Sequence, residues 1–167
     1  MTKRVNGKQK GNGFERKIAN LLSERFAGVL GIEQGFRRNP DSGSFFGGSN
    51  TQRTATHSMD YAIFGDLICP RNFAFSVECK HYKTAPTFQS IVEHTVKQWD
   101  DWLGQVVQDS INSGKQLALI VKYNNVPEIV FLQNPIAGTP ESFKYKNYYI
   151  YKLGTFLKQP DSEFFTQ

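Results

Sequence analysis

The chain has 167 residues, of which 39% are hydrophobic and 21% charged, a composition that fits one globular domain and excludes a disordered chain. No apolar run reaches the roughly 18 residues that a membrane helix needs, and no apolar segment follows the basic start, so neither a membrane span nor a secretory signal is expected. We therefore expect a cytoplasmic protein, and its two cysteines, Cys69 and Cys79, fit a reducing compartment.

The net charge of +5 is unevenly distributed along the chain. Residues 1–83 carry 13 Lys and Arg against 7 Asp and Glu, whereas residues 84–167 carry 7 against 8. A one-sided basic surface attracts polyanions, of which nucleic acid is the commonest. Mild basicity serves solubility equally well, so charge alone leaves the two interpretations about even.

The first predicted element is a helix from about Gly13 to Phe26, with apolar residues at helical spacing and Asn12 as its N-cap. Residues 1–10 are expected to form a basic flexible arm, residues 11–155 a single domain, and residues 156–167 a ragged tail. A long loop at residues 35–60 follows the helix, and long loops inside compact domains are often functional.

A hairpin is predicted next, with strands at residues 63–69 and 73–80 around a turn at residues 70–72. Strand alternation places Glu78 and Lys80 on one face of the second strand and Cys79 on the other. A three-residue turn pairs Asp66 with Ser76 and makes Asp66 a diagonal neighbour of Glu78. A change of one residue in the turn would reverse this arrangement.

The remaining elements are one long helix and three strands. The helix is expected from about Phe88 to Ser113, with a break near its middle as an alternative, and it stops at Gly114. The strands are expected at residues 116–123, 128–132 and 148–153, the first with apolar residues on both faces. This order of helix, strands, helix and strands predicts an α/β layer fold with a mixed sheet.

Asp66, Glu78 and Lys80 together have the residue types needed for phosphodiester hydrolysis. Mg²⁺ is held by one or two carboxylates together with waters and phosphate oxygens, lowers the pKa of a bound water and neutralises transition-state charge. A nearby lysine positions or deprotonates the attacking water. A Glu-x-Lys sequence on its own more often marks a solvent-exposed strand face. Here Glu78-x-Lys80 ends an apolar strand that follows Gly65-Asp66, and this combination is more specific to a catalytic site.

This pattern resembles the core motif of the PD-(D/E)xK nucleases, with Gly65 at the position of the motif's proline. Two further segments resemble Holliday-junction resolvases of archaeal type, including phage-borne relatives. One is the basic, Gly-rich segment at residues 10–16, which contains Glu15, and the other is Arg37-Arg38-Asn39-Pro40-Asp41-Ser42-Gly43-Ser44. The resemblance covers roughly residues 8–121.

The resemblance implies a restriction-endonuclease-like αβββαβ core with a mixed central sheet flanked by helices. It implies Mg²⁺, with Mn²⁺ as a substitute, bound by Asp66, Glu78, the backbone carbonyl of Cys79 and, directly or through water, Glu15, while Lys80 acts on the hydrolytic water. The implied substrate is branched DNA, cut to leave a 5′-phosphate, and neither an organic cofactor nor a membrane is involved. Two symmetric cuts imply a homodimer, for which the aromatic C-terminal third is either the dimer face or core.

Several residues have more than one candidate role. The spacing of Glu15 from Asn12 favours a capping box, whereas the resemblance places Glu15 at the metal site. Gln105 is a further candidate at the metal site, because some members of the superfamily place a glutamine there. Candidate DNA contacts, from their charge or hydroxyl groups and from the resemblance, are Lys8, Lys10, Arg37, Arg38, Ser42, Ser44, Arg53 and Lys83.

Two other functions remain as alternatives, a restriction-like or repair endonuclease on duplex DNA and a non-catalytic DNA-binding protein of the same fold. Clustered carboxylates repel DNA in the absence of a metal, which argues against the second. A zinc site is disfavoured, because the spacing of His57, Cys69, Cys79 and His81 matches no common zinc motif. Trp99, Trp102 and Val106 are expected in the core rather than in a base-stacking platform.

Overall fold

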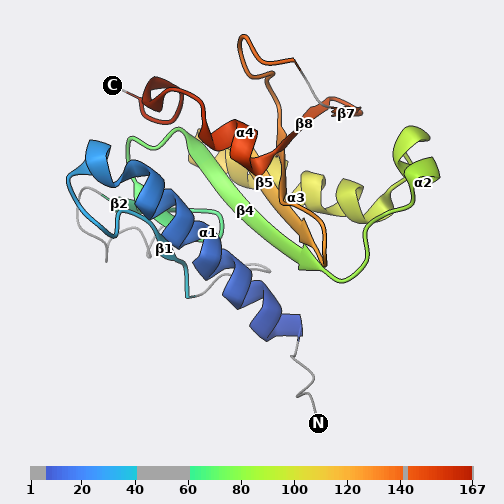
Figure 1. Ribbon diagram of the computed structural model, residues 1–167, viewed down its shortest axis with the longest axis horizontal. Coiled ribbons are helices and arrows are strands. Elements are labelled where there is room, and N and C mark those ends of the chain that lie inside the picture. The colour runs from blue at the N-terminus through green and yellow to red at the C-terminus, as the bar shows by residue number, and fades with distance from the viewer. Residues whose placement is uncertain (1–6, 41–60, 141–142, 167) are drawn as a thin grey trace.

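The computed structural model describes residues 7–40, 61–140 and 143–166 (Figure 1). The elements are α1 (Gly7–Leu30), β1 (Arg37–Arg38), β2 (Tyr61–Phe64), β3 (Leu67–Pro70), β4 (Phe75–Tyr82), α2 (Phe88–Val92), α3 (Lys97–Ser113), β5 (Gln116–Tyr123), β6 (Ile129–Leu132), β7 (Phe143–Tyr145), β8 (Tyr148–Lys152), α4 (Leu153–Leu157) and the 3₁₀ helix η3 (Asp161–Glu163). None of the helices in these ranges has the length and apolar character needed to cross a membrane.

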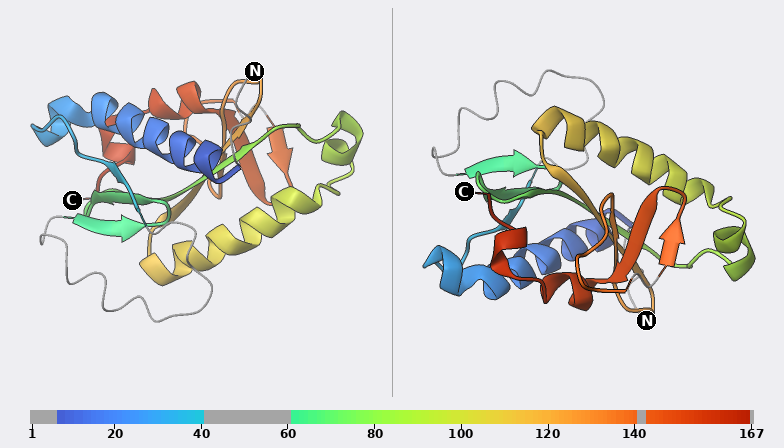
Figure 2. Two further views of the ribbon diagram at one scale, coloured as in Figure 1. Left: turned by 90° about the horizontal axis from the view of Figure 1, so that it is seen from below. Right: turned by 90° about the horizontal axis from the view of Figure 1, so that it is seen from above.

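A five-stranded mixed sheet in the order β4-β5-β6-β8-β7 forms the central layer. β4 and β5 run parallel, and the other neighbouring strands are antiparallel. α1 and α4 cover one face of this sheet and α3 covers the other, so that two hydrophobic clusters lie on opposite sides of it (Figure 2). The α/β layer fold with a mixed sheet, predicted from the order of the elements, is confirmed, and helices flank the central sheet as the resemblance implies.

The hydrophobic pattern of the sheet follows from this sandwich arrangement. Ala118 and Ile120 of β5 pack on the side of α1, while Leu117 and Leu119 pack on the side of α3. β5 is thus buried on both faces, as its apolar sequence predicts, and it occupies the expected residues 116–123.

The predicted hairpin of residues 63–69 and 73–80 is wrong. The chain instead reverses at Gly65 and Asp66, where β2 and β3 form an antiparallel pair that β1 extends to a small three-stranded sheet. Gly65 has a φ of 73°, and a positive φ at this position is what a two-residue hairpin turn requires. The turn after Pro70 does form, but it leads the chain into β4, which pairs with β5 along its whole length.

α1 is longer than predicted and contains the residues expected to precede it. Its first described residue is Gly7, so Asn12 lies inside the helix rather than at its N-cap, and residues 7–10 of the expected flexible arm are helical. The capping box between Asn12 and Glu15 is therefore excluded. The apolar face is as predicted, with Phe14, Ile18, Leu22 and Phe26 buried.

The long helix expected at residues 88–113 is divided into α2 and α3, as the alternative with a break predicts, but the break lies at residues 93–96, near the start of the range rather than at its middle. His94 lies in the break with a φ of 55°, a left-handed conformation that interrupts the helix. α3 ends at Gly114, whose φ of 66° is that of a left-handed C-cap. Trp99, Trp102 and Val106 are buried, so their predicted place in the core is confirmed.

The expected ragged tail is wrong, because Phe156 and Phe164 are buried. The ring of Phe164 packs 4.8 Å from Phe26 and 5.0 Å from Phe156, between centroids. Backbone bonds also attach this segment, since the Ala74 N–H donates to the carbonyl of Phe164. β7 was not predicted, and Tyr145 and Tyr151 of the aromatic C-terminal third are part of the core.

Candidate active site

Asp66 is held at the outer edge of β4 by the turn that separates β2 from β3. The Asp66 N–H donates to the carbonyl of Val77 at 2.9 Å, and the Cys79 N–H donates to Asp66 Oδ2 at 2.8 Å. A Cβ at Gly65 would overlap the Val77 carbonyl, so the turn lies directly on the strand. Proline, with φ fixed near about −65°, could not adopt the φ of 73° found at Gly65, which explains the departure from the motif's proline.

Glu78 and Lys80 lie on the face of β4 that is turned to α3, as strand alternation predicts. Lys80 Nζ donates to Glu78 Oε1 at 2.8 Å. Gln105 Nε2, from α3, lies 3.4 Å from the same oxygen, so this glutamine does reach the predicted site. Cys79 faces the opposite layer, where it packs in the cluster of α1.

The two buried carboxylates act on each other electrostatically. Burial raises the pKa of Asp66 well above its ordinary value, and the negative charge of Glu78 raises it further. Burial also raises the pKa of Glu78, although the ammonium of Lys80 acts in the opposite direction. For Lys80 burial acts to lower the pKa, but the charge of Glu78, the hydrogen bond to Glu78 and the charge of Asp66 together outweigh burial, and the pKa lies above its ordinary value.

This donor set fits a hard divalent cation. Within the described ranges, Asp66 Oδ1 and Glu78 Oε2 accept no hydrogen bond, so each carboxylate retains one oxygen for another ligand. No group of three His, Cys, Asp or Glu side chains suited to a metal ion occurs among the residues that the structure describes. Two carboxylates are nevertheless a sufficient protein contribution for Mg²⁺, which keeps several waters and takes phosphate oxygens as ligands.

Glu15 faces the same site from α1 and is buried there. Its negative charge acts to raise the pKa of both Asp66 and Glu78. Its Oε2 accepts a hydrogen bond from Arg38 Nε at 2.6 Å, and Arg38 also donates to Asn12 Oδ1 at 2.9 Å. The structure therefore places Glu15 inward, as predicted, in an ion pair with an arginine of the predicted DNA-contact loop.

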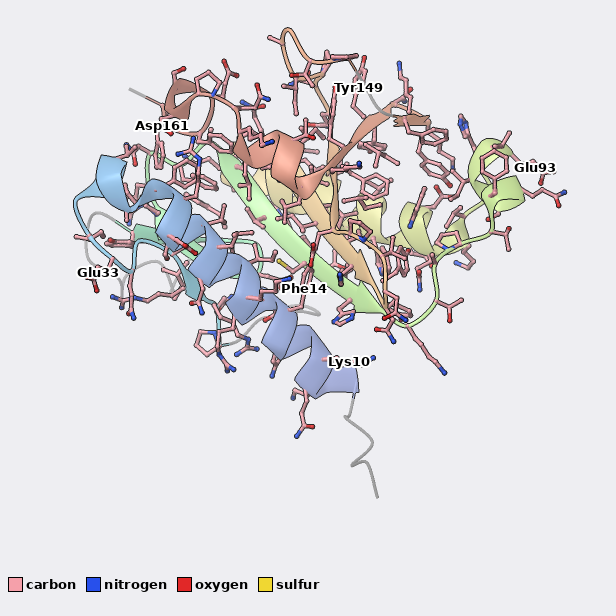
Figure 3. The ribbon with its side chains drawn as sticks, in the orientation of Figure 1. Lys10, Phe14, Glu33, Glu93, Tyr149 and Asp161 are labelled. Atoms are coloured by element: carbon pink, nitrogen blue, oxygen red, sulfur yellow. The ribbon has the colours of Figure 1, made fainter. Side chains whose placement is uncertain are left out.

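The other predicted DNA contacts lie in different surroundings. Arg37 and Lys83 are exposed, at β1 and just beyond β4, and Lys8 is exposed on α1. Lys10 Nζ lies 3.4 Å from Asn124 Oδ1, which His81 Nε2 approaches at 3.2 Å. Figure 3 shows Lys10 and Phe14 on α1, and the ring of Phe14 lies 5.6 Å from His81. The predicted residues that lie outside the described ranges are Ser42, Ser44, Arg53 and His57.

Asp109 is a residue of the site that the sequence reasoning missed. It follows Gln105 by one helical turn on α3, and residues four apart share a helix face. Burial raises the pKa of Asp109, and the charge of Lys80 acts to lower it, which places Asp109 within the electrostatic reach of Lys80. The spacing from Gln105 was the signal in the sequence that could have found it.

The family of the chain follows from its similarity to known proteins. No curated protein matches the chain. Among solved structures, the chain is similar to Hjc, a Holliday junction resolvase from the archaeal hyperthermophile Archaeoglobus fulgidus, with 14% identity, a TM-score of 0.39 and coverage of 87% of this chain and 91% of that one. The family model described as "Phage putative PDDEXK endonuclease" matches residues 6–160. The chain therefore belongs to this family of phage endonucleases, and the resemblance to the PD-(D/E)xK superfamily is confirmed.

Proposed function

We propose that the chain is a divalent-metal-dependent DNA endonuclease with Asp66, Glu78 and Lys80 as its catalytic residues and four-way junctions as its substrate. The observation that carries the proposal is the fixed pair of buried carboxylates, each with one oxygen that accepts no hydrogen bond from the described residues. Without a cation, this pair would repel a phosphate group. With one, it becomes the protein half of a phosphodiester hydrolysis site.

Asp66 and Glu78 would hold Mg²⁺, or Mn²⁺ in its place, and the bound ion supplies Lewis acidity toward the scissile phosphate and its water. The Cys79 N–H bonds to Asp66 at the free edge of β4, and the N–H and C=O groups of one strand residue point to the same side. This direction supports the Cys79 carbonyl as a further ligand. Glu15 would join directly or through a water, while Arg38 holds its Oε2.

Lys80 would orient the attacking water and stabilise the charge that develops on the phosphate. Its Nζ is held 2.8 Å from Glu78 Oε1, so the ammonium lies beside the same carboxylate that would hold the metal. Gln105 and Asp109, from α3, would position this pair from the other side. Enzymes stabilise phosphoryl-transfer transition states mainly with charges that are already in position before the reaction.

The branched substrate and a homodimer belong to the same proposal, because two symmetric nicks in a junction need two sites related by a twofold axis. A 5′-phosphate would be left at each nick. The exposed Arg37, Lys83 and Lys8 would contact DNA phosphates outside the cut.

The test is a cleavage assay with Mg²⁺ on an end-labelled four-way junction and on a linear duplex of the same arm sequence, with Asp66→Asn beside the wild type. Paired symmetric nicks in the junction, strongly reduced in Asp66→Asn, are expected. Cutting of the duplex at an equal rate would keep the nuclease and overturn the junction preference. Binding of both DNAs without cutting, in Mg²⁺ and in Mn²⁺, would favour a DNA-binding protein instead. Light scattering of the free and DNA-bound protein tests the dimer.

A further inference from the structure

We propose that Tyr82 contacts an unstacked nucleobase of the DNA next to the cut, and so favours substrates in which base stacking is interrupted. This inference rests on the proposed function, and it adds a binding residue that the motif does not contain. Three features support it: the position of Tyr82 on β4, the exposure of its ring and the positive charges beside it.

The position follows from strand geometry. Glu78, Lys80 and Tyr82 are two residues apart on β4, and alternate residues of a strand share one face. The Tyr82 backbone thus lies about 7 Å from Lys80 and about 13 Å from Glu78 at a rise of roughly 3.3 Å per residue. With a base step of about 3.4 Å along each DNA strand, Tyr82 is within roughly four base steps of a phosphate bound at Glu78.

The ring of Tyr82 is presented to solvent on a firm support. Tyr82 is 50% exposed, whereas Trp102 of α3, behind it, is 9% exposed. The two ring centroids lie 5.3 Å apart, with an angle of 57° between the rings. A ring that is already held by a buried neighbour loses little conformational freedom when a ligand packs on its other side.

The Tyr82 hydroxyl has no structural role comparable to those of the buried tyrosines. The hydroxyl of Tyr123 accepts from Trp99 Nε1 at 2.8 Å, and the hydroxyl of Tyr145 accepts from the Val96 N–H at 3.0 Å. Within the described part of the chain, the Tyr82 hydroxyl makes no hydrogen bond, and its one ring contact is Trp102. The packing of the ring on Trp102 therefore accounts for its inner face, whereas its outer face and its hydroxyl remain available to a ligand.

The charges around Tyr82 favour nucleic acid as the occupant. Lys80 precedes it on the same face, and the exposed Lys83 follows it directly. Aromatic rings beside cations are the usual means of binding unpaired nucleotides, because the cations bind phosphates and the ring stacks on a base. Bases inside a duplex have both faces covered by their neighbours, whereas a base at a branch point can offer one face to Tyr82. A second copy of this chain would bring the same cations against Lys80 and Lys83, which disfavours it as the occupant.

Binding of a junction with 2-aminopurine at the branch point tests this inference, with Ca²⁺ in place of Mg²⁺ to prevent cutting. Tyr82→Ala should weaken binding by about five- to 150-fold, the range found when a stacking ring is removed. It should also remove the fluorescence change of the branch-point base. Tyr82→Phe, which retains the ring, should behave as the wild type. The matched control is Phe143→Ala, because Phe143 is a 37% exposed aromatic residue on β7, at the opposite edge of the sheet.

Wild-type affinity and an unchanged fluorescence response in Tyr82→Ala would overturn the inference. So would a change of oligomeric state in DNA-free Tyr82→Ala, which would assign this surface to a second copy of the chain. Cleavage by the wild type is measured separately and decides the proposed nuclease activity. A protein that cuts DNA but whose Tyr82→Ala variant binds normally keeps the nuclease and loses only the base contact.

Discussion

The backbone N–H of Cys79 donates a hydrogen bond to Asp66 Oδ2 at 2.8 Å, and this bond fixes Asp66 next to Glu78. The contact depends on Gly65, whose φ is 73° and where a Cβ would overlap the Val77 carbonyl. We expect Gly65→Ala to lower the free energy of unfolding by about 2 kcal/mol or more, because the left-handed conformation alone costs roughly 1–2 kcal/mol. DNA cleavage should fall as well, since the turn must move away from β4. Thermal unfolding and the cleavage rate measure the two effects.

Gly28→Ala is the matched control for this substitution. Gly28 lies in α1 with open space where its Cβ would be, and alanine favours helix. Its unfolding free energy should rise by about 0.5–1 kcal/mol. If Gly65→Ala were as stable and as active as Gly28→Ala, the turn would not hold Asp66 in the way described.

The Arg38–Glu15 ion pair should compete with metal binding by Glu15. Arg38 Nε lies 2.6 Å from Glu15 Oε2, and both side chains are largely buried. Arg38→Gln removes a positive charge and this ion pair, so we expect Mn²⁺ to bind about tenfold more tightly. Calorimetric titration of the DNA-free protein measures the affinity.

Measurements in the Glu15→Gln variant separate competition for Glu15 from the simple loss of the Arg38 charge. In Glu15→Gln, the further change Arg38→Gln should leave the Mn²⁺ affinity nearly unaltered. Arg16→Gln, an exposed position on the same helix, controls for net charge. An equal gain in affinity in the presence and absence of Glu15 would show that Glu15 does not compete for the metal.

The alternation of β4 could be predicted from the sequence because it is a local property of a strand. Glu78 and Lys80 therefore appear on the predicted face, with Cys79 on the other. The pairing of Asp66 could not be derived in this way, because the choice of partner strand depends on residues far along the chain. Asp66 is close to Glu78 through the turn at Gly65, and not through the predicted hairpin.

The difference between local patterns and long-range contacts also explains why the structure of the two chain ends was not predicted. The apolar face of α1 has a clear helical period, but its early start has no apolar signal, because residues 7–13 are glycine and polar residues. The segment after Leu157 has too few residues to show a period, and its role depends on where Phe164 packs against Phe26 and Phe73. Asp109 is part of the site only because α3 crosses the face of β4 that carries Glu78 and Lys80.

The burial of Phe164 predicts that the C-terminal segment is required for stability. Phe164 is fully buried, with its ring between those of Phe26 and Phe156. Phe164→Ala should lower the unfolding free energy by about 3–5 kcal/mol, from lost burial and the cavity that remains. Denaturant unfolding measures this, with Phe143→Ala as the exposed control. A loss below about 1 kcal/mol would show that the segment is detached in solution.

The ionisation of Glu128 makes the free energy of unfolding depend on pH. Burial acts to raise its pKa, but hydrogen bonds from Lys17, from its own backbone N–H and from Lys122 together outweigh this and lower the pKa to about 2. Since the folded pKa lies below the unfolded value of about 4.3, the stabilisation is complete above that pH and is lost as the pH falls toward 2. Glu128→Gln should cost about 1 kcal/mol or less at pH 7, and much less near pH 2.

Unfolding curves of wild type and Glu128→Gln at several pH values test this. Asp101→Asn is the comparison, because the Lys97–Asp101 pair is exposed and contributes little at any pH. A constant difference between wild type and Glu128→Gln from pH 7 to pH 2 would contradict the assigned pKa.

The most direct test of the central claim is the rate of DNA cleavage by wild type and Glu78→Gln, with Mg²⁺ and with EDTA. Glu93→Gln is the control, because Glu93 is exposed next to α2 and bonds only to Gln89 among the described side chains. We predict cutting by wild type and Glu93→Gln in Mg²⁺ alone, and a rate at least about 100-fold lower in Glu78→Gln. Equal rates in Glu78→Gln and wild type, or cutting that persists in EDTA, would contradict a metal-dependent site at Asp66 and Glu78.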